Sequence, residues 1–182
     1  MRALSLAAAL ALAGCAVLHP RPSDPGLFLL PPSEAGFTGA LVQRVQLHRG
    51  ETTFDALASA EVTPTLLKLA VLSPLGNRML GLVWDGKKLE QERAPGVPKR
   101  FPAEIILRDL QLTFWPAASV ERALPSGWTL QDQGSVRTLR DGDKPAIVIH
   151  YGPSRLSDAI EFANEAVGYS LTITPLQQDG AR

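Results

Sequence analysis

The sequence predicts a mainly β protein of the α+β class, in which a curved antiparallel sheet of about ten strands forms an unclosed half-barrel. Short apolar or alternating segments, separated by turns rich in Pro and Gly, stand on both sides of one helical segment at residues 101–116. A sheet of many strands tends to curl, and a helix over its open side covers apolar surface. We therefore expect one central helix and a shorter second helix to cover the open side.

Five strands in meander order are expected before the central helix. In each of them, apolar residues alternate or run together over a length typical of strands. The turns carry their own signals, because Ser-Pro-Leu-Gly at residues 73–76 suits a β-turn and Asp-Gly at residues 85–86 is typical of a hairpin. The expected strands are residues 37–47, 53–62, 66–72, 79–84 and 88–90.

The central helix is predicted at residues 101–115 by an apolar stripe. Ile106, Leu110 and Phe114 recur at helical spacing. Pro102 suits the first turn, and Pro116 ends the helix because it cannot continue the backbone hydrogen-bond ladder. A second helix is expected at residues 116–124, and it is followed by five strands at residues 128–132, 137–140, 146–151, 158–164 and 169–174.

The first residues have the pattern of a secretory signal, with Arg2 before an apolar run at residues 3–13 that is shorter than a membrane-spanning helix of about 20 residues. The run ends in Leu-Ala-Gly-Cys at residues 12–15, which resembles a bacterial lipobox. The resemblance implies cleavage before Cys15 and acylation of its thiol, and two or three acyl chains anchor a protein firmly. Ala16 is not the Asp that often keeps lipoproteins at the inner membrane. We therefore expect the periplasmic face of the outer membrane of a Gram-negative bacterium, with an ordinary secretory signal as the alternative.

One folded domain is expected from the chain length. Five prolines make the segment between the Cys and the domain stiff and extended, although its Phe28, Leu29 and Leu30 leave docking on the domain open. The predicted divisions are a signal peptide at residues 1–14, the lipidated Cys and a Pro-rich tether at 15–36, the half-barrel at 37–176, and a disordered tail at 177–182.

Composition and motifs exclude several function classes. The formal net charge is zero, so no nucleic-acid partner is expected. His19, His48 and His150 are scattered and Cys15 is the only Cys, which is a poor basis for a metal site. The sequence has no Gly-x-Ser-x-Gly and no His-Glu-x-x-His. We therefore expect a protein that is not an enzyme and needs no cofactor.

The candidate binding site is an apolar cavity inside the half-barrel. Alanines dominate one face of residues 53–62, and small inward side chains leave room for a ligand, with close packing against the helix as the alternative. Arg108 and Asp109 are candidates for a polar cavity rim, with a structural salt bridge as the alternative. The predicted lining residues are Phe54, Ala56, Ala58, Leu67, Leu80, Leu82, Trp84, Leu110, Phe114 and Ile149.

Several short strings together resemble an uncharacterised family of proteobacterial lipoproteins, and the resemblance covers residues 28–175. That family is in turn similar in layout to the Lol-type lipoprotein carriers and receptors (LolA/LolB-like), which implies an unclosed β-barrel wrapped over helices around a cavity for acyl chains. The strings are the turn at 73–76, Asp-Gly-Lys-Lys-Leu-Glu at 85–90, Leu-Arg-Asp-Leu-Gln-Leu at 107–112, Trp-Pro at 115–116, Gly-Trp at 127–128 and Asp-Gly at 141–142.

The resemblance has one departure. The LolB receptor has an exposed leucine on a hairpin loop, which it uses to deliver cargo into the membrane. The matching loop here is taken to be residues 61–65, which is short, and Val62 or Leu66 is the nearest candidate.

The expected function is that of a LolB-like receptor or carrier accessory, anchored to the membrane by its N-terminal lipid. It would bind acyl chains or another long apolar cargo by burial alone. The resemblance implies a periplasmic carrier protein as a further partner. The alternative is a non-enzymatic envelope scaffold that docks a protein partner and has a barrel interior filled by side chains.

Overall fold

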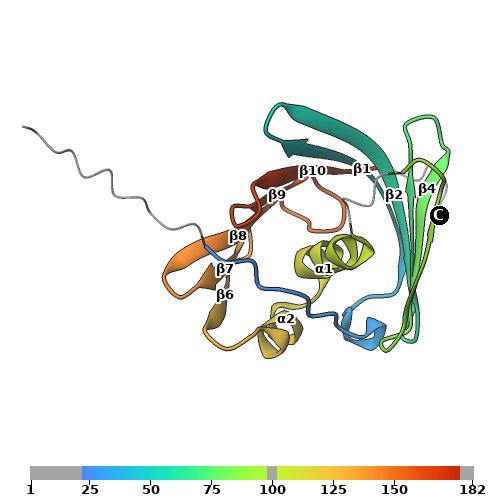
Figure 1. Cartoon of the computed structure of the whole chain (residues 1–182). Coiled ribbons are helices and arrows are strands. Elements are labelled where there is room, and N and C mark those ends of the chain that lie inside the picture. The colour runs from blue at the N-terminus through green and yellow to red at the C-terminus, as the bar shows by residue number, and fades with distance from the viewer. Residues whose placement is uncertain (1–21, 98–101, 177–182) are drawn as a thin grey trace, which may run out of the picture.

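The computed structural model describes residues 22–97 and 102–176, and it contains one antiparallel sheet that curves around a helix (Figure 1). The expected fold class is confirmed as a mostly β chain with an open sheet and two helices. The strands are β1 (Gly39–Arg49), β2 (Thr52–Val62), β3 (Leu67–Leu72), β4 (Arg78–Trp84), β5 (Leu89–Arg93), β6 (Trp128–Asp132), β7 (Val136–Asp141), β8 (Lys144–Tyr151), β9 (Ile160–Asn164) and β10 (Tyr169–Pro175).

The strand order explains why the sheet has two free ends. It runs β5-β4-β3-β2-β1-β10-β9-β8-β7-β6, so each half is a meander of hairpins and the two halves join where β1 pairs with β10. The ends of the sheet, β5 and β6, do not pair with each other. They are connected through α1 (Ala103–Phe114) and α2 (Ala117–Ala123), and α1 lies inside the curve of the sheet (Figure 1).

The core lies between the concave face of the sheet and α1. On β4 the inward row Leu80, Leu82 and Trp84 is buried, and on β8 Ile147 and Ile149 have no exposed surface. The intervening residues of β4 are partly exposed, as the period of two in a strand requires. Apolar burial on this one face holds the two halves of the sheet around the helix.

The sides of α1 are buried differently from what its apolar stripe predicts. Ile106 and Leu110 of the stripe are only half-buried, whereas Arg108 and Gln111 on the polar side have almost no exposed surface. The polar side is covered because a segment from the N-terminal part of the chain lies against it (Figure 1). Pro102 is the extended residue just before the helix rather than part of its first turn. Phe101, which the expected helix included, is outside the described residues.

The segment at residues 22–36, called the N-terminal strap below, packs on the domain. Pro25 and Ala35 are buried in it, and Leu30 is 5% exposed. At its end, Gly36 has a positive φ of 75°, and a Cβ there would lie 2.7 Å from the Pro116 ring. The boundary expected at residue 37 therefore does not separate a free tether from the domain, and docking, left open for Phe28, Leu29 and Leu30, is what the structure shows. Residues 15–21 and 177–182 lie outside the described residues.

Hydrogen bonds between side chains of the domain and the backbone of the strap explain why the strap stays in place. The Gln111 amide accepts from the Leu30 N–H at 2.8 Å and donates to the Leu30 carbonyl at 2.7 Å. The Trp84 indole donates to the same carbonyl at 2.8 Å. The strap thereby joins α1 to β4 and satisfies main-chain groups that burial would otherwise leave unpaired.

No helix in the two described ranges is both long and apolar enough to cross a membrane.

Candidate functional site

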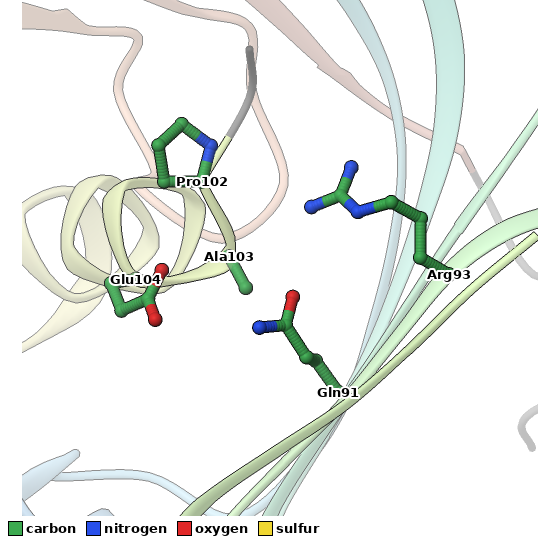
Figure 2. Close-up of a pocket in the computed structure, with 5 residues that line it drawn as sticks. All are labelled: Gln91, Arg93, Pro102, Ala103 and Glu104. Atoms are coloured by element: carbon green, nitrogen blue, oxygen red, sulfur yellow. The ribbon is translucent and has the colours of Figure 1, made fainter. Parts of the chain in front are cut away.

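A cleft opens where the free end of the sheet separates from the start of α1 (Figure 2). Its volume is about 380 Å³, which is within the range of small-molecule sites. Gln91 and Arg93 contribute to it from β5, and Pro102, Ala103 and Glu104 contribute from the start of α1. We call it the β5–α1 cleft.

The strand register explains why two polar side chains of β5 face the cleft. Gln91 lies opposite Leu82 and Arg93 lies opposite Leu80, so these four residues share the concave face of the sheet. In Figure 2 the side chains of Gln91 and Arg93 extend from β5 toward the start of the helix. The cleft itself is thus lined by the polar side chains of Gln91, Arg93 and Glu104 together with Pro102 and Ala103.

Most of the expected lining residues lie in the core and not on this cleft. Phe54 is 38% exposed, and Ala58 and Leu110 are half-buried. The physical reason is that α1 and the N-terminal strap occupy the volume that the sequence left for a ligand. None of the ten predicted lining residues borders the β5–α1 cleft or the smaller cavity described below. The buried ones among them are Ala56, Leu67, Leu80, Leu82, Trp84, Phe114 and Ile149.

Arg108 and Asp109 do not form a rim, because both side chains are buried in the interior. Arg108 is 0% exposed, and its guanidinium donates to Asp109 Oδ1 at 3.0 Å and to Asp24 Oδ1 at 2.7 Å. It also donates to the Gly26 carbonyl at 3.0 Å. The two neighbouring side chains therefore converge, and the pair is a structural ion pair that ties the strap to α1.

The carboxyl group of Asp109 is shared between this ion pair and the other half of the sheet. The Tyr169 hydroxyl on β10 donates to its Oδ2. Burial raises the pKa of Asp109 to about 6, although Arg108 and the Tyr169 hydrogen bond oppose the rise. Burial and the Asp109 carboxylate raise the pKa of the Tyr169 hydroxyl above its usual value. Burial thus disfavours the charged form of the Asp109 carboxyl group, and Arg108 and Tyr169 offset this effect only in part.

The C-terminal end of α1 is held by polar groups of β7 and β8. Arg137 donates to the carbonyls of Leu112 at 2.6 Å and Trp115 at 2.9 Å, and the Tyr151 hydroxyl donates to the carbonyl of Thr113 at 2.9 Å. These carbonyls have no partner within the helix because Pro116 stops the ladder. A cation there also complements the helix dipole.

Asp132 fixes the orientation of this cap. It accepts from Arg137 Nε at 2.9 Å and also pairs with Arg155, whose guanidinium lies 4.0 Å from the centre of the Tyr151 ring. Burial alone would raise the pKa of Asp132, but the hydrogen bonds from Arg155 and Arg137 hold it well below its usual range. The cap is therefore charged at neutral pH.

Sequence patterns missed Gln91, Gln111, Arg137 and Tyr169. Gln111 and Arg137 occupy helix and strand positions that look solvent-exposed, since their partners are main-chain groups distant in sequence. The sequence predicts the hairpin that places Tyr169 opposite Asn164. It gives no sign of the hydrogen bond between Tyr169 and Asp109.

Histidine and acidic residues form no group of three that could hold a metal ion within residues 22–97 and 102–176. His48 Nδ1 lies 3.1 Å from Thr53 Oγ1 at the first hairpin, and His150 is exposed on β8. His19 lies outside the described ranges.

These features define a class of protein: an open antiparallel half-barrel wrapped around a buried helix, with a cleft at the end where the sheet fails to close. A family model described as "Protein of unknown function (DUF3261)" matches residues 40–177. The chain therefore belongs to this family, and the expectation of an uncharacterised family is confirmed. No curated protein matches the sequence.

We expect Asp109→Asn to remove a pH dependence of stability. The folded pKa of about 6 lies above the unfolded value of about 3.9, so the folded state binds more protons between these values. Stability of the wild type, relative to Asp109→Asn, should therefore fall as pH rises from about 4 to about 6, on the order of 2 kcal/mol. Urea unfolding at several pH values measures the difference.

Asp55→Asn is the matched control, because the ion pair of Asp55 with Arg44 lies at the surface. The depressed pKa of Asp132 affects stability only at lower pH and is common to both proteins. If the free energies of unfolding of the wild type and Asp109→Asn changed with pH in the same way, the pKa of Asp109 would not be raised by folding, and the prediction would be wrong.

Proposed function

We propose that this protein is a lipid-anchored envelope protein that binds an acyl chain, or another long apolar cargo, in the β5–α1 cleft without chemical change. The observation that carries the proposal is the cleft of about 380 Å³ at the unclosed end of the sheet. It lies between the start of α1 and β5, and β5 is hydrogen-bonded to β4, whose inward row is apolar. Burial of apolar area supplies the affinity.

The distribution of polar contacts around α1 supports entry at this place. The hydrogen bonds described above join α1 to β7, β8, β10 and the strap. Leu67 of β3 and Leu82 of β4 belong to the same apolar core cluster as Leu107 of α1. Apolar contacts are non-directional, so an apolar ligand can replace them without leaving polar groups unpaired.

The lipobox at residues 12–15 supports attachment to the outer membrane through Cys15. The strap is described from residue 22 on, and the six residues 16–21 that separate it from Cys15 can span at most about 25 Å even when fully extended. The docked strap therefore keeps the domain close to the membrane surface. This is the arrangement that a receptor delivering cargo to that surface requires.

Leu75 supports a LolB-like mode of delivery. Val62 is 1% exposed and Leu66 is half-buried, so the β2–β3 loop offers no free leucine at its tip. The next hairpin loop, between β3 and β4, carries Leu75 with 89% of its surface exposed. The candidates expected at residues 62 and 66 are therefore replaced by Leu75 in this proposal.

A second candidate function is a docking scaffold for a protein partner. It is favoured by the filled interior, in which Leu107, Leu112 and Trp115 are 0% exposed. A scaffold needs no ligand space and uses the rigid outer surface of the half-barrel. The two functions differ in whether the isolated protein takes up an apolar probe.

Gln91→Trp should weaken binding of dansyl-undecanoic acid about tenfold or more, because the indole fills the β5–α1 cleft. Fluorescence titration of the full-length chain carrying Cys15→Ser measures this, since that chain cannot be acylated. Glu90→Trp is the matched control, because residue 90 is next in the strand and faces outward. Equal affinities would place the probe elsewhere, and no binding by the parent chain would favour the scaffold.

Cys15→Ala should abolish incorporation of labelled palmitate and move the protein from the membrane to the soluble periplasmic fraction. The reason is that the only thiol of the chain is lost. Labelling of growing cells followed by fractionation measures both effects. Palmitate incorporation that persists in Cys15→Ala would contradict the anchor.

Leu75→Glu should slow the transfer of bound dansyl-undecanoic acid to phospholipid vesicles several-fold and leave its affinity unchanged. A charged side chain at this exposed position resists contact with the bilayer interior. Stopped-flow fluorescence measures the transfer rate. Asn77→Glu places the same charge in the same loop as a control, and identical slowing by both variants would assign the effect to charge alone.

A further inference from the structure

Gln43 is a polar residue on the buried, concave face of β1. It stands in the inward row between Leu41 and Val45 and is 4% exposed. Its neighbours across the sheet are Ala58 on β2 and Pro175 on β10, which offer it no polar side chain. Its side-chain nitrogen, Nε2, is buried and has no hydrogen-bond acceptor among residues 22–97 and 102–176.

A buried N–H donor without an acceptor costs stability, and native proteins rarely leave one. The other inward residues of β1 are apolar, and an apolar side chain would fit this position without that cost. Gln43 therefore opposes the local pattern, which is typical of a position selected for binding rather than for folding.

Gln43 also lines a cavity of about 210 Å³ beside the end of β10. The main chain there is already used, since the Leu176 N–H donates to the Val42 carbonyl at 2.8 Å. Leu156, from the loop between β8 and β9, closes one side of the cavity. The complete lining is Ala40, Leu41, Val42, Gln43, Leu156, Pro175 and Leu176.

The lining selects a particular chemistry. Its side chains are apolar except for the amide of Gln43, and none of them is charged. A carboxylate buried here would lack a cation, whereas a neutral carbonyl pays a much smaller desolvation cost. The free donor requires an acceptor, and the leucine and proline side chains fit an aliphatic chain.

We propose that this cavity is a binding site for a neutral carbonyl group on a short aliphatic chain, such as an ester, with the carbonyl oxygen accepting a hydrogen bond from Gln43 Nε2. The site shares no residue with the β5–α1 cleft and lies at the β1–β10 junction, four strands away from β5. It stands independently of the acyl-binding function proposed above.

The test is a titration of the full-length chain carrying Cys15→Ser with methyl hexanoate, followed by NMR of the glutamine side-chain amides. The ester should shift the amide resonances of Gln43, and Gln43→Leu should weaken its affinity tenfold or more. Gln46→Leu is the matched control, because Gln46 is on the same strand and faces outward. Gln43→Met serves as a second variant in case the leucine variant fails to fold.

Two comparison ligands separate the sources of affinity. Heptane lacks the acceptor, and hexanoate replaces the neutral carbonyl with a charge, so both should bind more weakly than the ester. Equal binding of heptane, equal binding of hexanoate, unchanged ester affinity in the folded Gln43 variants, or no binding of the ester would each overturn the proposal. Binding of dansyl-undecanoic acid in the cleft is measured separately and is unaffected by any of these outcomes.

Discussion

The structure depends on one constraint, which is that a helix carrying charged and amide side chains lies inside the curve of a sheet. Arg108, Asp109 and Gln111 are all nearly inaccessible there. Buried polar groups need partners, and removing one partner of a buried pair is costly, about 3–5 kcal/mol. The N-terminal strap, β10 and β7 supply these partners. The helix thereby determines where the two ends of the folded chain must pack.

The same constraint accounts for the asymmetry of the half-barrel. The C-terminal end of α1 is fixed by Arg137 and Tyr151, and its polar side is fixed by the strap and Tyr169. Its N-terminal end borders the β5–α1 cleft instead. Polar contacts therefore hold the helix to β7, β8 and β10, whereas a cleft separates the start of the helix from β5.

The free edge at β5 is protected by charge. Glu90 pairs with Lys88 at 2.7 Å, and Glu92 pairs with Arg78. Charged edge strands resist pairing with other chains, so these charges protect the free edge against edge-to-edge association.

Much of the fold was readable from the sequence because the signals are local. A short apolar run predicts β4, the Asp85-Gly86 pair makes the β4–β5 turn, and Pro116 ends α1. The parts of the candidate sites that the sequence did not predict depend on contacts between segments distant in the chain. Nothing in the pattern distinguishes the inward Gln43 or Gln111 from surface residues, because burial of a polar side chain depends on its partners.

What the sequence by itself determined is therefore the set of strands and the central helix, since each rests on the period or chemistry of a few adjacent residues. Only the tertiary structure decided that the strap packs on the domain, that Arg108 and Asp109 pair with each other, and that Leu75 is the most exposed leucine of the described residues. The physical reason is that these outcomes depend on contacts between segments far apart in the chain. Such contacts are set by competition for one interior volume, which no local pattern encodes.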